Sequence, residues 1–423
     1  MKRRALVRAV TTAAAAALAW PRLAAAAAPR VAIVGAGWAG LAALHGLRRA
    51  LPAADVMLFD REAQFRSLPL SSAWLAGIAG ERLPRVELAE HAASRGAAFV
   101  RADLDAIDRD RRELRAGDRR WPWDALLLCT GAEADPGPWF GDDRHSASLM
   151  RARWSAGFAA SELDGLRRRL ESFTGGTLLM TVPPPPLRCP PAPYERALLL
   201  AHWMRRRGLK GRIVLLDSSS GMPRLDRLIA AHPAGLIEHR RHVVVQRVDP
   251  AAQRIDSSEG ELRWDEALLL PPMHAGALLR DAGLTRGGRF AAVDPDSLRS
   301  PLDDRIWLAG DALDVVSPLF GHYPKTAEVA AELGHAAALQ LAAALQGRSL
   351  GPADLPRSRC HLWLRADPPE QLLLEADFRR RGDGVIAQTL RHVDNPQPRG
   401  EDLAWAHELL ARRLGIGTAS TGS

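Results

Sequence analysis

The sequence predicts an α/β protein with two strand–helix–strand units and a smaller C-terminal domain, and three observations support this. A glycine triplet directly follows a short apolar run at residues 31–34. A second strand–loop–helix–strand pattern covers residues 175–220, and a later strand-like run leads into Gly310 and Asp311. Apolar runs of this length, alternating with helix-like stretches, predict buried parallel sheets. A length of 423 residues suffices for two or three domains.

Composition excludes several classes of protein. Hydrophobic residues make up 47% of the chain and charged residues 25%, which is typical of a globular protein and excludes a disordered or collagen-like chain. The formal net charge is +8, but five basic side chains lie in residues 1–28, which contain no acidic residue. Because the remainder mixes arginine with aspartate and glutamate, we expect no nucleic-acid partner.

Residues 1–28 predict a signal peptide for export. A basic start is followed by an Ala-rich apolar stretch and then by small residues at positions 24–28, which is the pattern of a secretory signal. The pair Arg3-Arg4 is similar to a twin-arginine signal, a route that exports proteins already folded around a cofactor. We therefore expect the mature chain in the periplasm. No segment reaches the ~20 apolar residues of a membrane span, so we expect none.

The first glycine triplet predicts a dinucleotide-binding (Rossmann-like) domain. Gly35 permits a tight turn, Gly37 lets the backbone approach a pyrophosphate, and Gly40 lets helix and strand pack closely. Twenty residues after the triplet, a second apolar run ends in Asp60, which would accept hydrogen bonds from ribose hydroxyls. Strand, triplet, helix, strand and acid in this order make the motif specific.

Two later segments indicate that the nucleotide is FAD. A strand-like run leads into Gly310 and Asp311, which resembles the Gly-Asp motif that flavoproteins with two dinucleotide folds place against FAD. The Ala-rich helix expected at 326–345 would point its N-terminus at the flavin. The end of an apolar strand at Thr130 and Gly131 resembles the junction where the chain leaves an FAD domain.

The second unit has a loop unsuited to a phosphate. Residues 183–193 read PPPPLRCPPAP, and proline has no N–H to donate and a fixed φ. Such a loop cannot wrap a pyrophosphate. We therefore expect this unit to have lost nicotinamide binding, so that the electron donor is a small molecule that reaches the flavin directly.

Cys189 and Glu195 lie at the start of the helix in this second unit. The positive end of the helix dipole favours a thiolate at Cys189, and Glu195 could move protons. The alternative, a structural cysteine and an ordinary N-terminal carboxylate, stays open at this point. Three cysteines permit one disulfide, and their spacing does not indicate which two would form it. No histidine or cysteine cluster has metal-ligand spacing, so we expect no metal site.

The stretch at 182–219, with VPPPPLRCPPAPYERALLL and RIVLLDSSS, resembles the flavoprotein subunit of flavocytochrome c sulfide dehydrogenase. Residues 31–40, the pair Leu70-Ser71 and the Gly-Asp motif agree with this resemblance, which covers nearly all of the mature chain and thins after Pro352. It implies a fold of the FAD-dependent pyridine nucleotide-disulfide reductase type, with two Rossmann-like domains and a redox disulfide beside the flavin.

The resemblance also implies roles for individual residues. One cysteine of the redox disulfide lies in the Arg-Cys-Pro-Pro motif, here Cys189, and the other follows the Ala-rich helix and its linker, here Cys360. Cys129 would then be a small core residue. The family attaches FAD through a cysteine at the position of Leu68, so we expect non-covalent FAD. Trp405 would approach the flavin, with a core position as the alternative.

The expected reaction begins when hydrosulfide or a related thiol attacks the Cys189–Cys360 disulfide, with Glu195 relaying a proton. Electrons would pass through FAD to a c-type cytochrome. Two alternatives are an NAD(P)H-dependent flavin reductase and a non-catalytic, exported flavin-binding scaffold of a cytochrome complex. The expected domains are a signal peptide at 1–28, an FAD domain at 29–140 and 273–348, an NAD-like domain at 141–272, and a C-terminal domain at 349–423.

Overall fold

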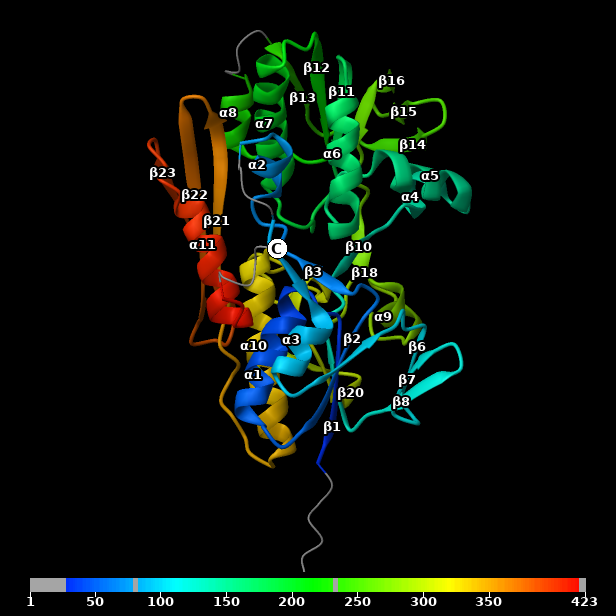
Figure 1. The fold of residues 1–423 in the computed structure, drawn as a ribbon, viewed down its shortest axis with the longest axis vertical. Helices are drawn as coiled ribbons and strands as arrows, with labels where there is room; N and C mark the ends of the chain where they lie inside the picture. The colour runs from blue at the N-terminus through cyan, green and yellow to red at the C-terminus, as the bar shows by residue number, and fades with distance from the viewer. Residues whose placement is uncertain (1–27, 79–82, 231–234, 418–423) are drawn as a thin grey trace, which may run out of the picture.

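The computed structural model describes residues 28–78, 83–230 and 235–417, so the predicted signal peptide lies outside the described residues except for its last position. Two units built on parallel sheets lie one above the other in Figure 1, and the end of the chain runs along one side of both. The predicted α/β class is confirmed. No helix in the described part of the chain is long and apolar enough to cross a membrane.

The lower unit is a six-stranded sheet in the order β19-β20-β9-β1-β2-β5, parallel except for β19. Its central strands are short apolar runs with their side chains buried, as expected for a parallel sheet covered on both faces. Helices α1 and α10 pack closely because Gly334 lacks a side chain: a Cβ there would lie 2.0 Å from the Ala39 carbonyl oxygen. The elements are β1 (Arg30–Val34), α1 (Trp38–Ala50), β2 (Asp55–Asp60), β5 (Ala98–Arg101), β9 (Ala125–Leu128), β19 (Arg299–Ser300), β20 (Asp303–Leu308) and α10 (Ala327–Leu345).

Smaller elements decorate this sheet. A two-stranded sheet and a three-stranded meander fill the connections between its strands, and a short antiparallel pair, β10 with β18, links the two units. They are β3 (Gln64–Arg66), α2 (Ser71–Leu75), β4 (Arg85–Glu87), α3 (Leu88–Ser94), β6 (Ala106–Asp108), β7 (Glu113–Ala116), β8 (Arg119–Pro122), β10 (Ala132–Ala134), β18 (Met273–Ala275) and α9 (Ala277–Asp281).

The upper unit is a four-stranded parallel sheet in the order β13-β12-β11-β17, with a three-stranded meander beside it. Strand β11, helix α7 and strand β12 repeat the topology of β1, α1 and β2. The elements are α4 (Gly137–Phe140), α5 (Arg144–Trp154), α6 (Leu163–Ser172), β11 (Gly176–Val182), α7 (Ala192–Arg206), β12 (Gly211–Asp217), α8 (Pro223–Ala230), β13 (Ile237–Arg240), β14 (Val245–Asp249), β15 (Arg254–Ser257), β16 (Gly260–Arg263) and β17 (Glu266–Leu268).

The last part of the chain forms a three-stranded antiparallel sheet and a helix, seen at the left of Figure 1. The elements are β21 (Arg357–Ala366), β22 (Pro369–Arg380), β23 (Ile386–Asn395), α11 (Glu401–Leu409) and a π-helical turn (Leu410–Leu414). Strand β21 packs against α7 of the upper unit and against α10 of the lower unit. This strand therefore spans the junction between the two parallel-sheet units. The predicted domain boundaries themselves stay a prediction.

Candidate functional site

The eight predicted cofactor residues gather at one edge of the lower sheet. Strands β20, β9, β1 and β2 are parallel neighbours, so their carboxyl ends lie together, which is where open α/β sheets bind ligands. All eight residues lie at or just beyond these strand ends: Gly35, Gly37, Gly40, Asp60, Thr130, Gly131, Gly310 and Asp311.

The glycine loop has the geometry that its sequence predicts. Gly35 has a φ of +96°, and a Cβ there would lie 2.4 Å from the Cys129 carbonyl oxygen. At Gly40 a Cβ would lie 1.8 Å from the Gly35 carbonyl oxygen, so neither position accepts a side chain. Gly37 is exposed, and a Cβ there would meet nothing within 4 Å. The backbone at Gly37, directly before helix α1, is thus open to a ligand.

The polar groups around this loop fit FAD. Asp60 accepts hydrogen bonds from the backbone N–H groups of Ala36 at 2.6 Å and Glu62 at 2.9 Å, which fixes the carboxylate beside the loop. It stays half-exposed, and its oxygens have further acceptor sites. The hydroxyl oxygen of Thr130 is buried and has no hydrogen-bond partner in the described structure. The open backbone at Gly37, the free acceptor sites of Asp60 and the unpaired Thr130 hydroxyl are groups to which a dinucleotide could hydrogen-bond.

Lys325, which the sequence reasoning passed over, lies at the Gly310-Asp311 turn. Its buried Nζ donates hydrogen bonds to the carbonyl oxygens of Asp311 at 2.6 Å and Leu313 at 3.1 Å, and lies 4.0 Å from the centre of the Phe290 ring. Burial lowers its pKa to about 8. The sequence could have indicated a role for Lys325, because this residue directly precedes the helix that was expected to face the flavin.

The two cysteines named by the resemblance lie together although 171 positions separate them. Cys189 precedes α7 with a φ of +47°, and its backbone N–H donates to the Lys325 carbonyl oxygen at 2.8 Å. Cys360 lies in β21, and the Cys189 and Cys360 thiols are hydrogen-bonded to each other. This hydrogen bond and burial raise the pKa of Cys360 well above its usual value. All three cysteines are free thiols in this structure.

Cys129 belongs to the core instead. It follows β9 directly, its side chain is buried in the main apolar cluster, and burial raises the pKa of its thiol. A thiol held neutral in an apolar core is a poor nucleophile and a poor metal ligand. Cys129 is therefore a core residue, whereas Cys189 and Cys360 interact with each other.

Glu195, in the first turn of α7, lies beside the cysteine pair. Its carboxylate is buried, accepts the Trp363 backbone N–H at 2.9 Å and is hydrogen-bonded to the Ser72 side chain. Burial outweighs these contacts and raises its pKa to about 7. A carboxyl group with this pKa can take up or release a proton near neutral pH, as a general base or acid must.

Arg196 places a buried positive charge next to Glu195. Its guanidinium donates to the Ala156 carbonyl oxygen and lies 4.7 Å from the centre of the Phe158 ring, and burial lowers its pKa to about 10. The Cys189 side chain interacts electrostatically with Arg196, whereas Glu195 and Glu328 act on Cys360. The site is therefore asymmetric, because an arginine faces Cys189 and carboxylates face Cys360. Arg196 follows Glu195 in the PYER motif, which is the signal that could have found it.

Arg188, also missed, connects the cysteine loop to the lower unit. Its guanidinium donates to the Asp311 carboxylate at 3.1 Å, to the Ala132 carbonyl oxygen at 2.7 Å and to the Phe158 carbonyl oxygen at 2.6 Å. Its place directly before Cys189 in the Arg-Cys-Pro-Pro motif was the available signal. Arg188 therefore fixes the proline-rich loop against the predicted flavin-binding turn.

In the upper unit, the acid at the end of β12 is hydrogen-bonded by neighbouring protein groups. Asp217 is 0% exposed and accepts hydrogen bonds from the Tyr194 hydroxyl at 2.5 Å, and from the Ser219 backbone N–H and hydroxyl at 2.8 and 2.7 Å. His239 Nε2 lies 3.0 Å from the same carboxylate. The Asp217 carboxylate is therefore occupied by protein groups, unlike an acid that is free to accept ribose hydroxyls.

Two family models match parts of this chain. Residues 164–269 match the family described as the central part of the sulfide dehydrogenase [flavocytochrome c] flavoprotein chain, and residues 29–165 match the pyridine nucleotide-disulphide oxidoreductase family. The resemblance seen at 182–219 is thereby confirmed. The first match covers Cys189 and Glu195, and the second covers the glycine loop, so the predicted cofactor is supported as well.

Solved structures agree in fold. The sulfide:quinone oxidoreductase of the hyperthermophilic bacterium Aquifex aeolicus is 16% identical over 93% of both chains, with a TM-score of 0.73. An NAD-dependent persulfide reductase from A. fulgidus is 15% identical over 89% of this chain and 76% of that chain, with a TM-score of 0.60. A ferredoxin reductase from Rhodopseudomonas palustris is 17% identical over 86% and 88%, with a TM-score of 0.60. The predicted disulfide-reductase type of fold is confirmed.

Proposed function

We propose that this chain, which is a flavoprotein oxidoreductase of the sulfide dehydrogenase and disulfide oxidoreductase type, oxidises hydrosulfide or a related thiol. In this proposal Cys189 and Cys360 form a redox disulfide, and the electrons leave for a c-type cytochrome in the periplasm. The single observation behind it is the hydrogen bond between two thiols that come from distant parts of the chain.

The asymmetry of charge around the two sulfurs suggests how the disulfide would open. Hydrosulfide attacks Cys360 Sγ, a bond forms between the hydrosulfide sulfur and Cys360, and the bond between the two cysteine sulfurs breaks. The electron pair of the broken bond stays on Cys189 as a thiolate. Cys189 is the better leaving group of the two, because the carboxylates of Glu195 and Glu328 disfavour a thiolate at Cys360.

Closing the disulfide again completes the balance. A second hydrosulfide takes the outer sulfur from Cys360 as hydrogen disulfide and leaves the Cys360 thiol. When this thiol and the Cys189 thiolate re-form their bond, one proton and two electrons are released, which is the net loss of the two hydrosulfides. Glu195 takes the proton, because a carboxyl group with a pKa of about 7 is partly ionised at neutral pH. FAD, held by the glycine loop and the strand ends of the lower sheet, supplies a two-electron acceptor that also releases electrons singly, as a haem protein requires.

The flavin is proposed to bind without a covalent link. The residue at the family's attachment position is Leu68, whose side chain offers no nucleophile. Precipitation of the purified protein with acid should leave the flavin in the supernatant. Yellow protein in the pellet after this treatment would show a covalent bond at another residue.

Rapid mixing tests the proposed donor. Sulfide should bleach the oxidised flavin band within the mixing experiment, and NADH should not. Cys189→Ser and Cys360→Ser should each lower the bleaching rate on the order of a thousandfold while flavin content stays at the wild-type level. Cys129→Ser, the matched control, should leave the rate unchanged. Bleaching by NADH, or none with sulfide, cysteine or glutathione, contradicts the proposal.

The acceptor and the location need separate experiments. A soluble c-type cytochrome should be reduced by the protein only when sulfide is present. In cells, the chain with residues 1–28 should be recovered from the periplasm, and Arg3→Lys/Arg4→Lys should retain it inside. Recovery of both forms from the cytoplasm contradicts export, and an inert protein that copurifies with a cytochrome favours the scaffold alternative.

A further inference from the structure

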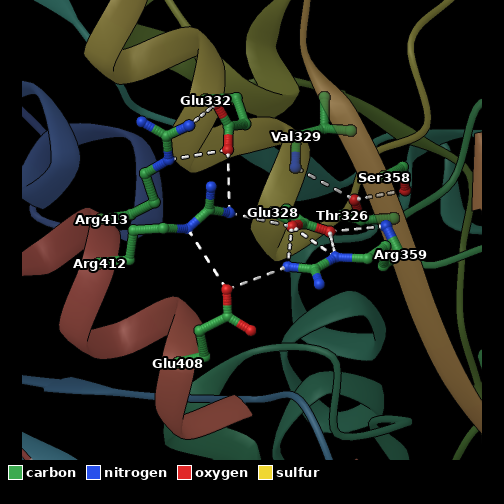
Figure 2. Close-up of polar contacts among 9 residues, drawn as sticks. All are labelled: Thr326, Glu328, Val329, Glu332, Ser358, Arg359, Glu408, Arg412 and Arg413. Atoms are coloured by element: carbon green, nitrogen blue, oxygen red, sulfur yellow. Dashed lines mark hydrogen bonds and ion pairs between the residues drawn. The ribbon is translucent and has the colours of Figure 1, made fainter. Parts of the chain in front are cut away.

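The first turn of α10 contacts both segments that hold the cysteines. Its N-cap, Thr326, hydrogen-bonds Ser358 through the two hydroxyls at 3.3 Å. Glu328, whose side chain is 0% exposed, accepts the backbone N–H of Arg359 at 2.7 Å and its guanidinium at 2.9 and 3.1 Å. Figure 2 shows these contacts crossing from the helix to strand β21. Ser358 and Arg359 directly precede Cys360.

The same short segment also holds the other cysteine. Lys325, the residue before the N-cap, accepts the Cys189 backbone N–H through its carbonyl oxygen at 2.8 Å. Residues 325–328 therefore bind the main chain at Cys189 on one side and the main chain next to Cys360 on the other. The two cysteines belong to separate parts of the fold, so this segment sets where their sulfur atoms meet.

Glu332 offers a contrast one helical turn later. Its carboxylate pairs with Arg413, with Nε at 2.7 Å, and with Arg412 at 3.4 Å, both from the π-helical turn at the end of the chain. Within the described part of the chain, its ion-pair partners are these two arginines, and neither lies in β21. Figure 2 shows the two glutamates on the same helix: both contact Arg412, but Glu328 alone reaches Arg359, and Glu332 alone reaches Arg413.

We propose that Glu328 is a positioning residue for Cys360: by holding Arg359 against the first turn of α10, it fixes the Cys360 sulfur against Cys189. This rests on the proposed redox disulfide and adds a residue to it. A buried carboxylate that accepts both the main-chain and side-chain groups of Arg359 leaves the strand little freedom. Loosening the strand lowers the effective concentration of one thiol at the other, and with it the equilibrium constant for disulfide formation.

The test measures that equilibrium constant in the flavin-loaded protein. Wild type and variants are equilibrated with mixtures of reduced and oxidised glutathione, free thiols are blocked with iodoacetamide, and the Cys189–Cys360 bond is counted by mass spectrometry. Glu328→Gln should lower the constant about tenfold. Glu332→Gln, the matched control on the same helix, should leave it within a factor of two of wild type. Flavin content and melting temperature are recorded for each variant, because a merely structural role would change these and not the thiol equilibrium.

The outcomes separate this inference from the function it rests on. A disulfide in wild type that is equally stable in Glu328→Gln overturns the positioning role and leaves the proposed function standing. If wild type forms no disulfide at any glutathione ratio, the redox pair and the positioning role fall together. If Glu328→Gln does not retain flavin, Arg359→Gln decides, because it removes the guanidinium that Glu328 binds: a shift of about twofold to threefold supports the role, and none overturns it.

Discussion

The two strand–helix–strand units share a topology and differ in what their loops leave free. In the lower unit, strands β1 and β2 pair in parallel and the helix start at Gly37 has an open backbone. In the upper unit, strands β11 and β12 pair in the same way, but residues 183–193 are rich in proline and hold Cys189 at the helix start. We therefore expect the shared topology to bind a nucleotide only where N–H groups at the helix start are free.

The acids that end β2 and β12 also differ in whether they are free to bind a ligand. Asp60 is half-exposed and hydrogen-bonds two backbone N–H groups, whereas Asp217 is fully buried and meets a tyrosine, a histidine and a serine. The first acid can still accept a ligand and the second supports the fold. In the proposed function, the helix start of the upper unit instead carries sulfur and proton chemistry, at Cys189 and Glu195.

The largest expected effect comes from the glycine loop. In Gly40→Ala the new Cβ would lie 1.8 Å from the Gly35 carbonyl oxygen, so the turn must rearrange and its phosphate cradle is lost. Purified Gly40→Ala should hold less than about a tenth of the wild-type flavin per chain, measured by absorbance near 450 nm against protein concentration. Wild-type flavin content in this variant would contradict the placement of the cofactor.

Glu195, at the start of α7, should make the free energy of unfolding depend on pH. The start of α1 has no ionisable side chain at residues 37–43 and should not contribute such a dependence. The pKa of Glu195 is raised from 4.5 to about 7, so between these values the folded chain holds a proton that the unfolded chain has released. The free energy of unfolding therefore falls as the pH rises through this window, by about 3 kcal/mol in total. Glu195→Gln should remove this dependence in urea titrations at pH 4.5–7.5. An unchanged slope in the variant would assign the dependence to another group.

Exchanging the two acids for amides should separate binding from stability. Asp217→Asn weakens buried hydrogen bonds and should lower the free energy of unfolding by about 2 kcal/mol, with no loss of flavin from the folded protein. Asp60→Asn should instead weaken FAD binding about tenfold, with a smaller loss of stability. Isothermal titration of the flavin-free protein with FAD, together with urea unfolding, measures both. Equal effects from the two variants would remove the distinction drawn between these acids.

The smallest effect concerns a glycine of the upper unit. Gly165 lies within α6, and a Cβ there would meet nothing within 4 Å. Gly165→Ala should stabilise the protein by roughly 0.5–1 kcal/mol and keep full flavin content, because alanine loses less entropy in a helix. Thermal unfolding checks this. Flavin loss here would mean that Gly40→Ala acts through general damage rather than through the cradle.

Features whose physical cause lies within a few residues could be predicted from the sequence. The glycine loop, the proline-rich loop and the alternation of apolar runs with helices define their own backbone geometry, and the family resemblance named Cys189 and Cys360. Lys325, Arg188 and Arg196 were missed because nothing near them in the sequence shows what surrounds them. Arg188 contacts Asp311, which lies 123 positions away, and Lys325 and Arg196 are buried by the packing of the fold.

The sequence by itself determined which helix start can cradle a phosphate, because the glycine φ angles and the missing proline N–H groups are local properties. Only the tertiary structure decided that residues 325–328 contact the main chain at Cys189 and next to Cys360. It also decided that Asp217 is buried and hydrogen-bonded within the protein, whereas Asp60 keeps free acceptor sites. It also decided that burial raises the pKa of Glu195 to about 7. Desolvation and charge pairing depend on which distant groups surround a side chain, and that is settled only when the domains pack together.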